Sequence, residues 1–597
     1  MTVIATRLHA LRDRLTALGV QGFIQPRADE HQGEYVPARA ERLAWLTGFT
    51  GSAGSAVVLA DQAAVFVDGR YTLQAADEVA AEAFTICPLA NMTPARWIER
   101  NAKVGGAIGF DPWLMTPTQL TRFEAATKAA GARLVPLDEN PIDAVWADQP
   151  APPQDPARPH DAAYTGETSE VRREKIAAAL KDARADAVFL NAPDSIAWLL
   201  NIRGSDVPFT PFCLAFAILH QDATVDLFID PAKADEAIRA HLGEGVRLHA
   251  PGQLMDALDH LGVDENRVLL APDTAPVIVR DRLQAAGAEV VPGADPCQLP
   301  KACKTDTELA GMRAAHRRDG VALCRFLAWL DGEAPTGTVT ETSAAERLEA
   351  FRRESDLCRG LSFPTISGAG PNGAIVHYRV DETTNRALEA GTLYLVDSGA
   401  QYPDGTTDVT RTVAIGDPDD EMRDRFTRVL KGHIALARAV FPKGTTGSQL
   451  DALARTPLWD AGLDYDHGTG HGVGSYLSVH EGPQRISKSG STVALQAGMV
   501  VSNEPGYYKT GAYGIRIENL IAVAPMAAPE RAERDLLGFE TLTLAPIDRR
   551  LIDTDLLDGD ERAWIDAYHA RVRGEIGAGL QGGEITRAWL EAVTAPL

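Results

Sequence analysis

The strongest structural signal in this sequence is the segment Tyr394-Leu-Val-Asp397-Ser-Gly-Ala-Gln-Tyr-Pro403-Asp-Gly405-Thr-Thr-Asp408-Val-Thr-Arg411-Thr. Its Pro-Asp-Gly triplet is a turn signal between two β-prone runs, which predicts an antiparallel hairpin. If the turn is centred between Tyr402 and Pro403, Asp397 and Asp408 face each other with their Cβ atoms roughly 5 Å apart. Two like charges at that distance need a cation between them, and divalent cations prefer such hard oxygen ligands. The segment therefore predicts a metal-binding hairpin; the alternative is two solvated surface aspartates, and another loop would change the register.

Further along the chain, histidines stand among glycines in the stretch His467-Gly-Thr-Gly470-His471-Gly-Val-Gly474, and His480 follows shortly after. Glycine at this density disfavours a helix, so the spacing of His467 and His471 does not indicate a helical zinc site. Glycine does let the backbone approach a ligand closely, and histidine supplies a nitrogen ligand or a proton. A lone histidine is more often structural, but three so close together indicate a functional segment.

Two more segments supply carboxylates: Ser502-Asn-Glu504-Pro-Gly506 and Gly514-Ile-Arg516-Ile-Glu518-Asn519. Arg516 and Glu518 are two residues apart and would share one strand face, where a metal or a surface salt bridge could partner the charge. In total, four carboxylates and one histidine exceed the needs of one ion and suit a bridged pair about 3.5–4 Å apart. Two such ions lower the pKa of a bridging water, so that a metal-bridging hydroxide attacks the substrate. Arg516 and the remaining histidines are candidates for proton transfer and substrate anchoring.

One apparent nucleotide motif is rejected. Gly368-Ala-Gly370-Pro-Asn-Gly373 satisfies G-x-G-x-x-G, but residues 374–380 are expected to be extended rather than helical. A dinucleotide site requires a helix at that position.

The first half of the chain contains an internal repeat. Ala44-Trp-Leu46 precedes Gly51-Ser52, and about 150 residues later Ala197-Trp-Leu199 precedes Gly204-Ser205 at the same spacing. In each copy two apolar extended runs follow (residues 54–59 and 64–68, then 213–219 and 224–230), and helices are expected from Leu73 and Ala232. Such a repeat indicates a duplicated α/β domain rather than a solenoid; chance recurrence of common packing motifs is the alternative.

The domain organisation follows from composition. Five prolines crowd residues 150–159, which predicts a linker. A capping box at Thr305 and Glu308 predicts a long helix over 309–331. Residues 391–523 are expected to be rich in short strands, and helices are expected over 560–577 and 584–593. We therefore expect four domains, at residues 1–150, 160–302, 303–528 and 529–597.

Composition narrows the functional classes. The 597-residue chain carries a net charge of −24, which argues against nucleic-acid binding because no basic excess is available for phosphates. Six scattered cysteines are no disulfide scaffold and favour a reducing, cytoplasmic setting. No signal peptide and no membrane-spanning segment are expected.

The sequence resembles the pita-bread metallopeptidases and, within them, the long cytosolic X-prolyl aminopeptidases, over nearly its whole length. The motifs that carry this resemblance are Asp29-Glu-His-Gln-Gly-Glu-Tyr35, Gly48-Phe-Thr-Gly-Ser-Ala-Gly54, Asn201-Ile-Arg-Gly-Ser-Asp206, Glu504-Pro-Gly-Tyr-Tyr508, Gly514-Ile-Arg-Ile-Glu-Asn519 and Gly538-Phe-Glu-Thr-Leu-Thr-Leu544 with Trp564 and Tyr568. The resemblance implies two related N-terminal α/β domains, an α+β pita-bread domain with a curved antiparallel sheet, and a C-terminal extension.

The resemblance also implies the chemistry. Asp397 and Glu504 are expected to be ligands of two metal ions, Asp408 and Glu518 bridging ligands, and His471 the sole histidine ligand. His377 and His480 are expected to line the substrate site and assist proton movement, with His467, Arg516 and Tyr508 as further candidates. The metal implied is manganese, although zinc, cobalt or iron(II) would fit this ligand set. The implied substrates are peptides with a free N-terminus and proline second, and the implied assembly is a homodimer.

Other functions remain open at this stage. Prolidase, a dipeptidase of the same fold, shares the ligands, but the duplicated N-terminal unit and the long C-terminal tail favour the aminopeptidase. Methionine aminopeptidase shares the ligands but does not need such domains. A catalytically inactive binding module or a metal-free creatinase-like hydrolase is disfavoured because all five ligand positions are filled.

Overall fold

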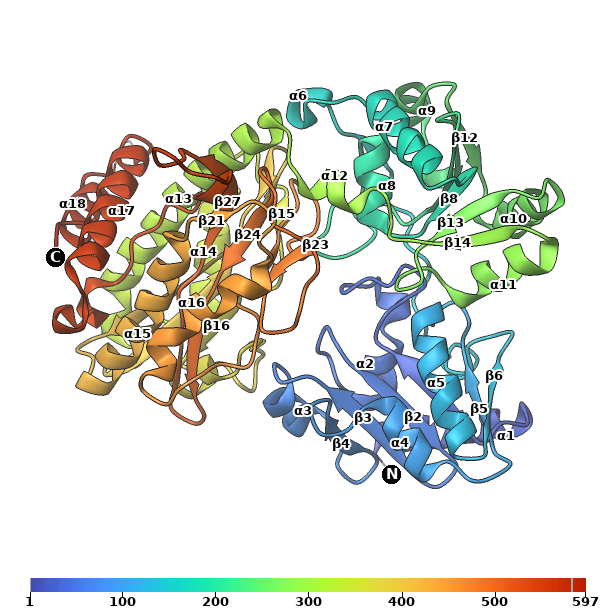
Figure 1. The fold of residues 1–597 in the computed structure, drawn as a ribbon. Coiled ribbons are helices and arrows are strands. Elements are labelled where there is room, and N and C mark those ends of the chain that lie inside the picture. The colour runs from blue at the N-terminus through green and yellow to red at the C-terminus, as the bar shows by residue number, and fades with distance from the viewer. Residues whose placement is uncertain (1, 581–582) are drawn as a thin grey trace. The chain divides into compact units, whose positions relative to one another are not determined.

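A computed structural model describes residues 2–580 and 583–597 (Figure 1). The chain divides into two compact units. The first contains Met1–Asp161 and Glu167–Gln298, and the second contains Ala162–Gly166 and Leu299–Leu597. Each unit is described separately below.

The first unit contains two six-stranded sheets of the same topology. The strand orders are β4-β3-β2-β1-β5-β6 and β12-β11-β10-β8-β13-β14, and each strand has a counterpart of the same direction at the same place in the other sheet. The predicted duplication is therefore confirmed. The strands are β1 (Gly22–Pro26), β2 (Ser55–Leu59), β3 (Ala63–Val67), β4 (Thr85–Pro88), β5 (Ala107–Phe110), β6 (Arg133–Pro136), β8 (Ala187–Leu190), β10 (Phe216–His220), β11 (Val225–Phe228), β12 (Val246–His249), β13 (Arg267–Leu270) and β14 (Glu289–Pro292).

The Ala-Trp-Leu repeat marks equivalent short helices. It lies in α2 (Arg42–Thr47) and in α8 (Pro193–Leu200), and both helices end on a left-handed residue, Gly48 in one and Asn201 in the other. Glycine and asparagine are the residues that adopt this conformation at the lowest cost, so they stop both helices at the same point. The other helices of this unit are α1 (Val3–Ala17), α3 (Thr72–Glu78), α4 (Pro94–Asn101), α5 (Pro117–Ala129), α7 (Ser169–Asp182), α9 (Glu236–Leu242), α10 (Leu254–Val263) and α11 (Val277–Ala286).

The proline-rich stretch contains no helix. Its one regular element is the two-residue strand β7 (Arg158–Pro159), which pairs with β9 (Ile202–Arg203). The helix expected from Ala232 begins later, with α9, because Pro231 to Lys233 form a single 3-10 turn capped by Asp230.

The second unit is built on short antiparallel sheets covered by helices. The long helix α13 (Asp306–Glu333) begins with the predicted capping box of Thr305 and Glu308. Two helices occur where only short strands were expected, α15 (Asp420–Ala437) and α16 (Gly447–Trp459), so that prediction was incomplete. The remaining helices are α6 (Ala162–Thr165), α12 (Gln298–Ala302, across the unit boundary), α14 (Glu341–Arg353), α17 (Gly559–Gly577) and α18 (Glu584–Val593).

Three sheets carry the segments of chemical interest. Their orders are β16-β17-β20, β21-β28-β27-β24-β22-β23 and β25-β26, and a further small sheet is β15-β18-β19. Every ladder among these strands is antiparallel. The strands are β15 (Gly360–Leu361), β16 (Ile366–Ala369), β17 (Thr392–Ser398), β18 (Ala400–Tyr402), β19 (Gly405–Thr406), β20 (Val409–Ile415), β21 (Phe441–Pro442), β22 (Gly470–Gly472), β23 (Glu481–Ile486), β24 (Val500–Asn503), β25 (Gly506–Lys509), β26 (Tyr513–Arg516), β27 (Asn519–Met526) and β28 (Leu536–Thr541).

The hairpin forms, but its register differs from the one expected. Tyr402 pairs with Gly405, so Pro403 and Asp404 are the two central residues of the turn. Asp397 consequently lies opposite Thr410, and Asp408 is its diagonal neighbour. A shift of two residues keeps both carboxylates on one face of the sheet, because side chains alternate with a period of two.

The glycine-rich stretch at residues 368–373 leads into a 3-10 helix, Gly370–Ala374, and not into an α-helix. The extended run expected over 374–380 is absent, since these residues form turns and irregular backbone. No α-helix follows the glycines over the described residues 374–380, so the helix that a dinucleotide site needs is missing there.

The C-terminal helices pack against other helices of the second unit. Ile565, Tyr568 and Ile576 of α17 and Leu590 of α18 are buried in the cluster that also contains Phe426 and Leu430 of α15. Figure 1 shows α17 and α18, in red, beside α13. Both helices match the predicted ranges to within one residue.

Candidate metal centre

Three buried carboxylates lie at the ends of strands. Asp397 is near the end of β17, Asp408 immediately precedes β20, and Glu518 immediately precedes β27. Thr410, opposite Asp397 in the ladder, donates its hydroxyl hydrogen to Glu518 Oε2 at 2.7 Å and accepts a hydrogen bond from Arg516 Nε at 3.2 Å. The threonine therefore joins the two strands that carry these acids.

His471, on β22, lies between two of the acids. Its Nε2 is 3.5 Å from Asp408 Oδ2 and 3.6 Å from Glu504 Oε1. Its Nδ1 is 3.0 Å from the carbonyl oxygen of Gly472, which can only accept a hydrogen bond. The hydrogen of the neutral ring therefore lies on Nδ1, and the Nε2 lone pair points to the carboxylates, as a metal ligand requires.

Ser502 ties this histidine to the fourth carboxylate. The Ser502 hydroxyl accepts from the His471 backbone N–H at 3.0 Å and donates to Glu504 Oε1 at 3.2 Å. Glu504 follows β24 directly and is half-buried. The structure thus brings together four of the five residues predicted as ligands: one atom each of Asp408, His471 and Glu518 lie within 4.8 Å of one another, and Glu504 adjoins His471.

Asp397 joins the group through Arg516. The guanidinium Nη2 is 2.6 Å from Asp397 Oδ2. The other oxygen, Oδ1, is buried and has no hydrogen-bond partner. A buried carboxylate oxygen without a donor is costly, and a metal ion is the partner that would satisfy it.

The electrostatics of the cluster call for positive charge. Burial, and then the neighbouring carboxylates, raise the pKa of Glu518 well above its usual range, and burial raises the pKa of Glu504. Burial also raises the pKa of Asp397 to about 6, despite Arg516. Burial alone would lower the pKa of His471, but Asp408 and Glu504 outweigh it and raise it to about 9. Divalent cations would remove this mutual repulsion, so the donor set fits a metal centre.

The further candidates surround this cluster. The rings of His471 and His480 are 4.3 Å apart in an edge-on arrangement. Tyr508 accepts from Arg516 Nη1 at 2.6 Å, and its hydroxyl is 2.8 Å from His467 Nε2. Tyr508 is therefore linked to Asp397 through Arg516, and His467 is linked to it through Tyr508 and Arg516.

His377 lies half-buried in the turn after residues 370–374. Ile375 and Tyr378 on either side pack against Leu395 of β17. Leu395 and Asp397 point to the same face of that strand, so the turn that contains His377 packs on the face that carries Asp397.

Sequence reasoning missed Thr410, Ser502 and the pair Asp451 and Arg455 described below. Thr410 and Ser502 are each two residues from a predicted ligand on a strand and therefore share its face. That periodicity was the signal that could have found them. Asp451 and Arg455 lie on α16, a helix that was not predicted, so no comparable signal pointed to them.

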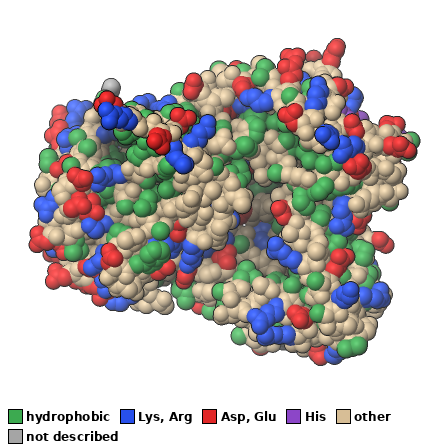
Figure 2. All heavy atoms as spheres, viewed as in Figure 1, with side chains coloured by type: hydrophobic (Ala, Val, Ile, Leu, Met, Phe, Trp, Pro, Cys, Tyr) green, Lys and Arg blue, Asp and Glu red, His purple; other side chains and the backbone are tan. Residues whose placement is uncertain are grey.

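The surface offers no basic patch on the face shown in Figure 2, where Lys and Arg side chains are interspersed with Asp and Glu. Within residues 2–580 and 583–597, none of the helices combines the length and the apolar character that crossing a bilayer requires.

Comparison with known families matches four consecutive parts of the chain. Residues 310–525 match metallopeptidase family M24, and residues 535–597 match the C-terminal region of that family. Residues 7–145 and 148–308 each match the creatinase/prolidase N-terminal domain.

Individual relatives align over the full length. The probable Xaa-Pro aminopeptidase P of Aspergillus niger is 40% identical over 607 residues, covering 99% of this chain and 98% of that protein. The protein of the same name from Laccaria bicolor is 40% identical and covers 99% and 93%.

Two solved structures of proline-specific peptidases are also similar to this chain. The X-prolyl aminopeptidase of Caenorhabditis elegans, described as a cytosolic enzyme with a di-nuclear active site, is 36% identical, covers 100% of both chains and has a TM-score of 0.96. The Xaa-Pro dipeptidase of Bacillus anthracis is 25% identical with a TM-score of 0.52 and covers 64% of this chain. The chain belongs to metallopeptidase family M24 and, within that family, to the Xaa-Pro aminopeptidase P proteins.

Proposed function

We propose that this metal-dependent Xaa-Pro aminopeptidase holds two divalent ions with Asp397, Asp408, His471, Glu504 and Glu518, and releases the first residue of peptides whose second residue is proline. The observation that carries the assignment of these residues is the convergence of three buried acids, the half-buried Glu504 and one histidine, with Asp397 Oδ1 unpartnered. Asp408 and Glu518 lie with His471 at the centre of the cluster and are proposed as the bridging ligands. Ions held there supply an acidified water and an electrophile for the scissile carbonyl.

The surrounding residues of the chain orient this site. Thr410 holds Glu518 and Arg516 holds Asp397, so each carboxylate keeps its second oxygen for an ion. The Gly472 carbonyl fixes the His471 ring with Nε2 toward the acids. His480, beside His471, and His377, on the Asp397 face, are proposed to bind the substrate and move protons, and Tyr508 to help position it.

The identity of the metal and the assembly are also proposals. Oxygen donors with a single imidazole favour manganese(II) over softer ions. We propose a homodimer in the cytoplasm, with domains at residues 1–150, 160–302, 303–528 and 529–597. The four family matches support these domain bounds, and the description of the similar Caenorhabditis elegans protein as a cytosolic enzyme supports the proposed location.

The test is metal-dependent release of the first residue from a peptide such as Arg-Pro-Pro, with the dipeptide Gly-Pro as the comparison. Activity on the tripeptide and little on the dipeptide is expected; the reverse would identify a prolidase. Asp408→Ala should lower kcat/KM about a thousandfold or more, since it removes several kcal/mol of charge stabilisation. The control Asp417→Ala changes an exposed aspartate just after the same hairpin and should retain full activity. Wild-type-like turnover by Asp408→Ala would contradict the bridging role.

A further inference from the structure

Helix α16 places a fully buried guanidinium beneath the loop that leads to His471. The guanidinium belongs to Arg455, and its helix has no ligand of the metal centre. We propose that Arg455 is a positioning residue of the active site: it fixes the main chain at His467, and thereby the chain of hydrogen bonds that orients Asp397. This inference rests on the proposed function.

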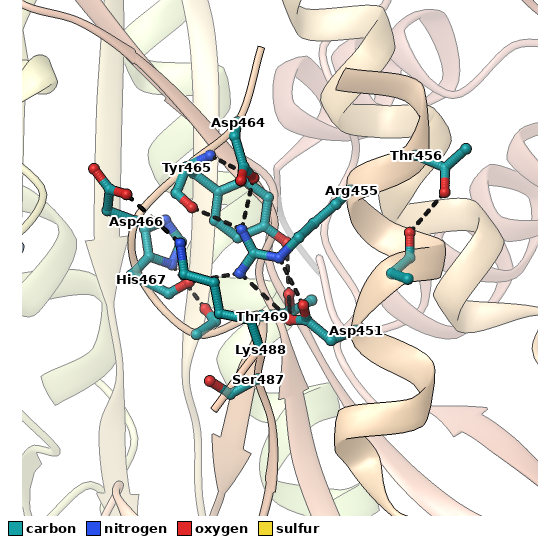
Figure 3. Close-up of polar contacts among 12 residues, drawn as sticks. Asp451, Arg455, Thr456, Asp464, Tyr465, Asp466, His467, Thr469, Ser487 and Lys488 are labelled. Carbon is teal, nitrogen blue, oxygen red and sulfur yellow. Dashed lines mark hydrogen bonds and ion pairs between the residues drawn. The ribbon is translucent and has the colours of Figure 1, made fainter. Parts of the chain in front are cut away.

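Arg455 is bound on every side, as Figure 3 shows. Its Nε donates to Asp451 Oδ2 at 2.7 Å, and its Nη1 donates to Asp464 Oδ1 at 2.7 Å and to the carbonyl oxygen of Tyr465 at 2.6 Å. Its Nη2 donates to the carbonyl oxygen of His467 at 2.8 Å. The guanidinium carbon lies 3.8 Å from the centre of the Tyr465 ring. The Arg455 side chain therefore donates hydrogen bonds to three residues of segment 464–467, namely Asp464, Tyr465 and His467.

Asp451, the other charged residue of this pair on α16, binds the loop at Thr469, two residues beyond His467. Its Oδ1 accepts the hydroxyl hydrogen of Thr469 at 2.6 Å, and the Tyr465 hydroxyl is 2.5 Å from the same Thr469 oxygen. The carbonyl oxygen of Thr469 in turn accepts a hydrogen bond from the backbone N–H of Glu504 at 2.8 Å. The pair on α16 thus holds the backbone on both sides of Gly468.

The direction of the hydrogen bonds beyond His467 is fixed by chemistry. His467 Nδ1 is 2.8 Å from the carbonyl oxygen of Gly468, so it carries the hydrogen and Nε2 is an acceptor. The Tyr508 hydroxyl must then donate to Nε2, which leaves its oxygen to accept from Arg516 Nη1. Arg516 Nη2 completes the chain at Asp397 Oδ2.

This chain of hydrogen bonds can orient Asp397 only if the His467 backbone, at its other end, stays in place. If the His467 backbone moves, Nε2 moves away from Tyr508, and the tyrosine hydroxyl is free to rotate and release Arg516. A displacement of about 1 Å far from the reacting atoms can cost about 100-fold in rate. Lysine in place of Arg455 keeps the charge but offers no planar fork, so it cannot bind Asp451, Asp464 and the two carbonyls together.

The experiment compares Arg455→Lys with the wild-type enzyme on an Xaa-Pro tripeptide at saturating manganese. We expect kcat to fall about 10- to 100-fold while KM changes less than about threefold, since the effect reaches the chemistry through Asp397. Arg172→Lys is the matched control: Arg172 is equally buried, donates to Trp198 and Asn201, and stacks on the Trp198 ring, but it lies in the first unit. It should lower the melting temperature similarly and change kcat less than about twofold.

A double-mutant cycle separates positioning from general damage. In a Tyr508→Phe background, where the chain is already cut, Arg455→Lys should cost less than about threefold in kcat. Equal fold losses in the two backgrounds, or an unchanged kcat in Arg455→Lys, would overturn the proposal. Should Arg455→Lys fold poorly, Thr469→Val removes one tie without touching the buried charge, and a loss of about 3- to 10-fold is expected.

A readout without turnover keeps the two proposals distinguishable. Amide hydrogen exchange over residues 466–471 should quicken in Arg455→Lys and stay at the wild-type rate in Arg172→Lys. Unchanged amide exchange in Arg455→Lys would refute the proposal that Arg455 fixes the main chain at His467, whatever the activity of the variant. A wild-type enzyme that is inactive on Xaa-Pro peptides, with faster exchange in Arg455→Lys, would refute only the proposed function.

Discussion

Removal of the metal ions should leave an apoprotein whose stability declines as pH rises. Burial raises the pKa of Asp397 to about 6, against about 4 in an unfolded chain. A carboxyl group with a raised folded-state pKa binds its proton more tightly when folded, so its penalty is absent below pH 4 and complete above pH 6. The raised pKa values of Glu504 and Glu518 act with the same sign. The charge of His471, whose pKa is raised to about 9, supports folding below about pH 6.5, and that support is lost as pH rises through 9.

The size of this effect can be worked out for Asp397 alone. A rise of about two pKa units corresponds to about 3 kcal/mol. For a unit of roughly 300 residues, an unfolding entropy of about 0.6 kcal/mol/K converts this into a melting temperature lower by about 5 °C. The raised pKa of His471 arises from carboxylates of the same cluster, so its contribution is not added to these roughly 3 kcal/mol. Binding two divalent ions requires a charged Asp397 and a neutral His471, so the ions should reverse the loss and bind more tightly at higher pH.

Scanning calorimetry of the apoprotein and the manganese-loaded protein at pH 5 and pH 8 tests this linkage. Because about half of the Asp397 penalty is already present at pH 5, the melting temperature of the second unit should rise on metal addition by at least about 2 °C more at pH 8 than at pH 5. Asp397→Asn removes the titrating carboxyl and should flatten the apoprotein profile by about that amount. An apoprotein equally stable at both pH values, or a metal-induced rise independent of pH, would refute the electrostatic account of this site.

Two further predictions concern stability. Glu481→Gln removes a carboxylate that the buried amines of Lys301 and Lys304 share, and it should destabilise the second unit by about 3–5 kcal/mol in chemical denaturation, whereas Glu389→Gln on the surface should not. Ile565→Ala, on the buried face of α17, should lower the free energy of unfolding by about 2–5 kcal/mol with unchanged kcat per folded molecule. Its control, Ile585→Ala at an 87% exposed position, should stay within about 0.5 kcal/mol; equal effects of the two would mean that α17 contributes no core packing.

The N-terminal fold could be predicted because its signal is repeated. Each Ala-Trp-Leu helix ends on a residue that tolerates the left-handed conformation, and a matching pair of extended runs follows each copy. Two copies of one pattern are far less ambiguous than either alone. The strand order and the mixed directions within each sheet depend on packing between distant segments, and no local pattern encodes them.

The hairpin shows where local reasoning failed. Proline at the second position and glycine at the fourth position of a tight turn favour Pro403 and Asp404 as its central residues, which is the register observed. The information was present in the sequence, but the turn was centred one residue too early. The consequence was small, since a shift of two in the pairing keeps Asp397 and Asp408 on the same face.

Helices α15 and α16 were missed for another reason. Glycine and proline in the loops around them gave the whole region the composition of short strands. Yet Phe426, Val429, Leu430 and Ile434 of α15 are buried at helical spacing after an N-cap at Asp419. The cost of the omission was functional: Arg455 and Asp451 lie on α16, so the support beneath His467 could not be anticipated.

The net charge of the assembled site supports the two metal ions that the number of predicted ligands had indicated. Among the residues that the structure describes, Arg516 is the cation that contacts a carboxylate of the predicted set. The nearby buried Arg411 is occupied by neutral acceptors, including the carbonyl oxygens of Thr410 and Glu518 and the hydroxyl of Tyr568. Four ionised carboxylates and one guanidinium leave a net charge of −3 when His471 is neutral. One divalent ion would leave −1, and a second would bring it to +1, so only the second ion gives the centre the positive charge that favours hydroxide over water.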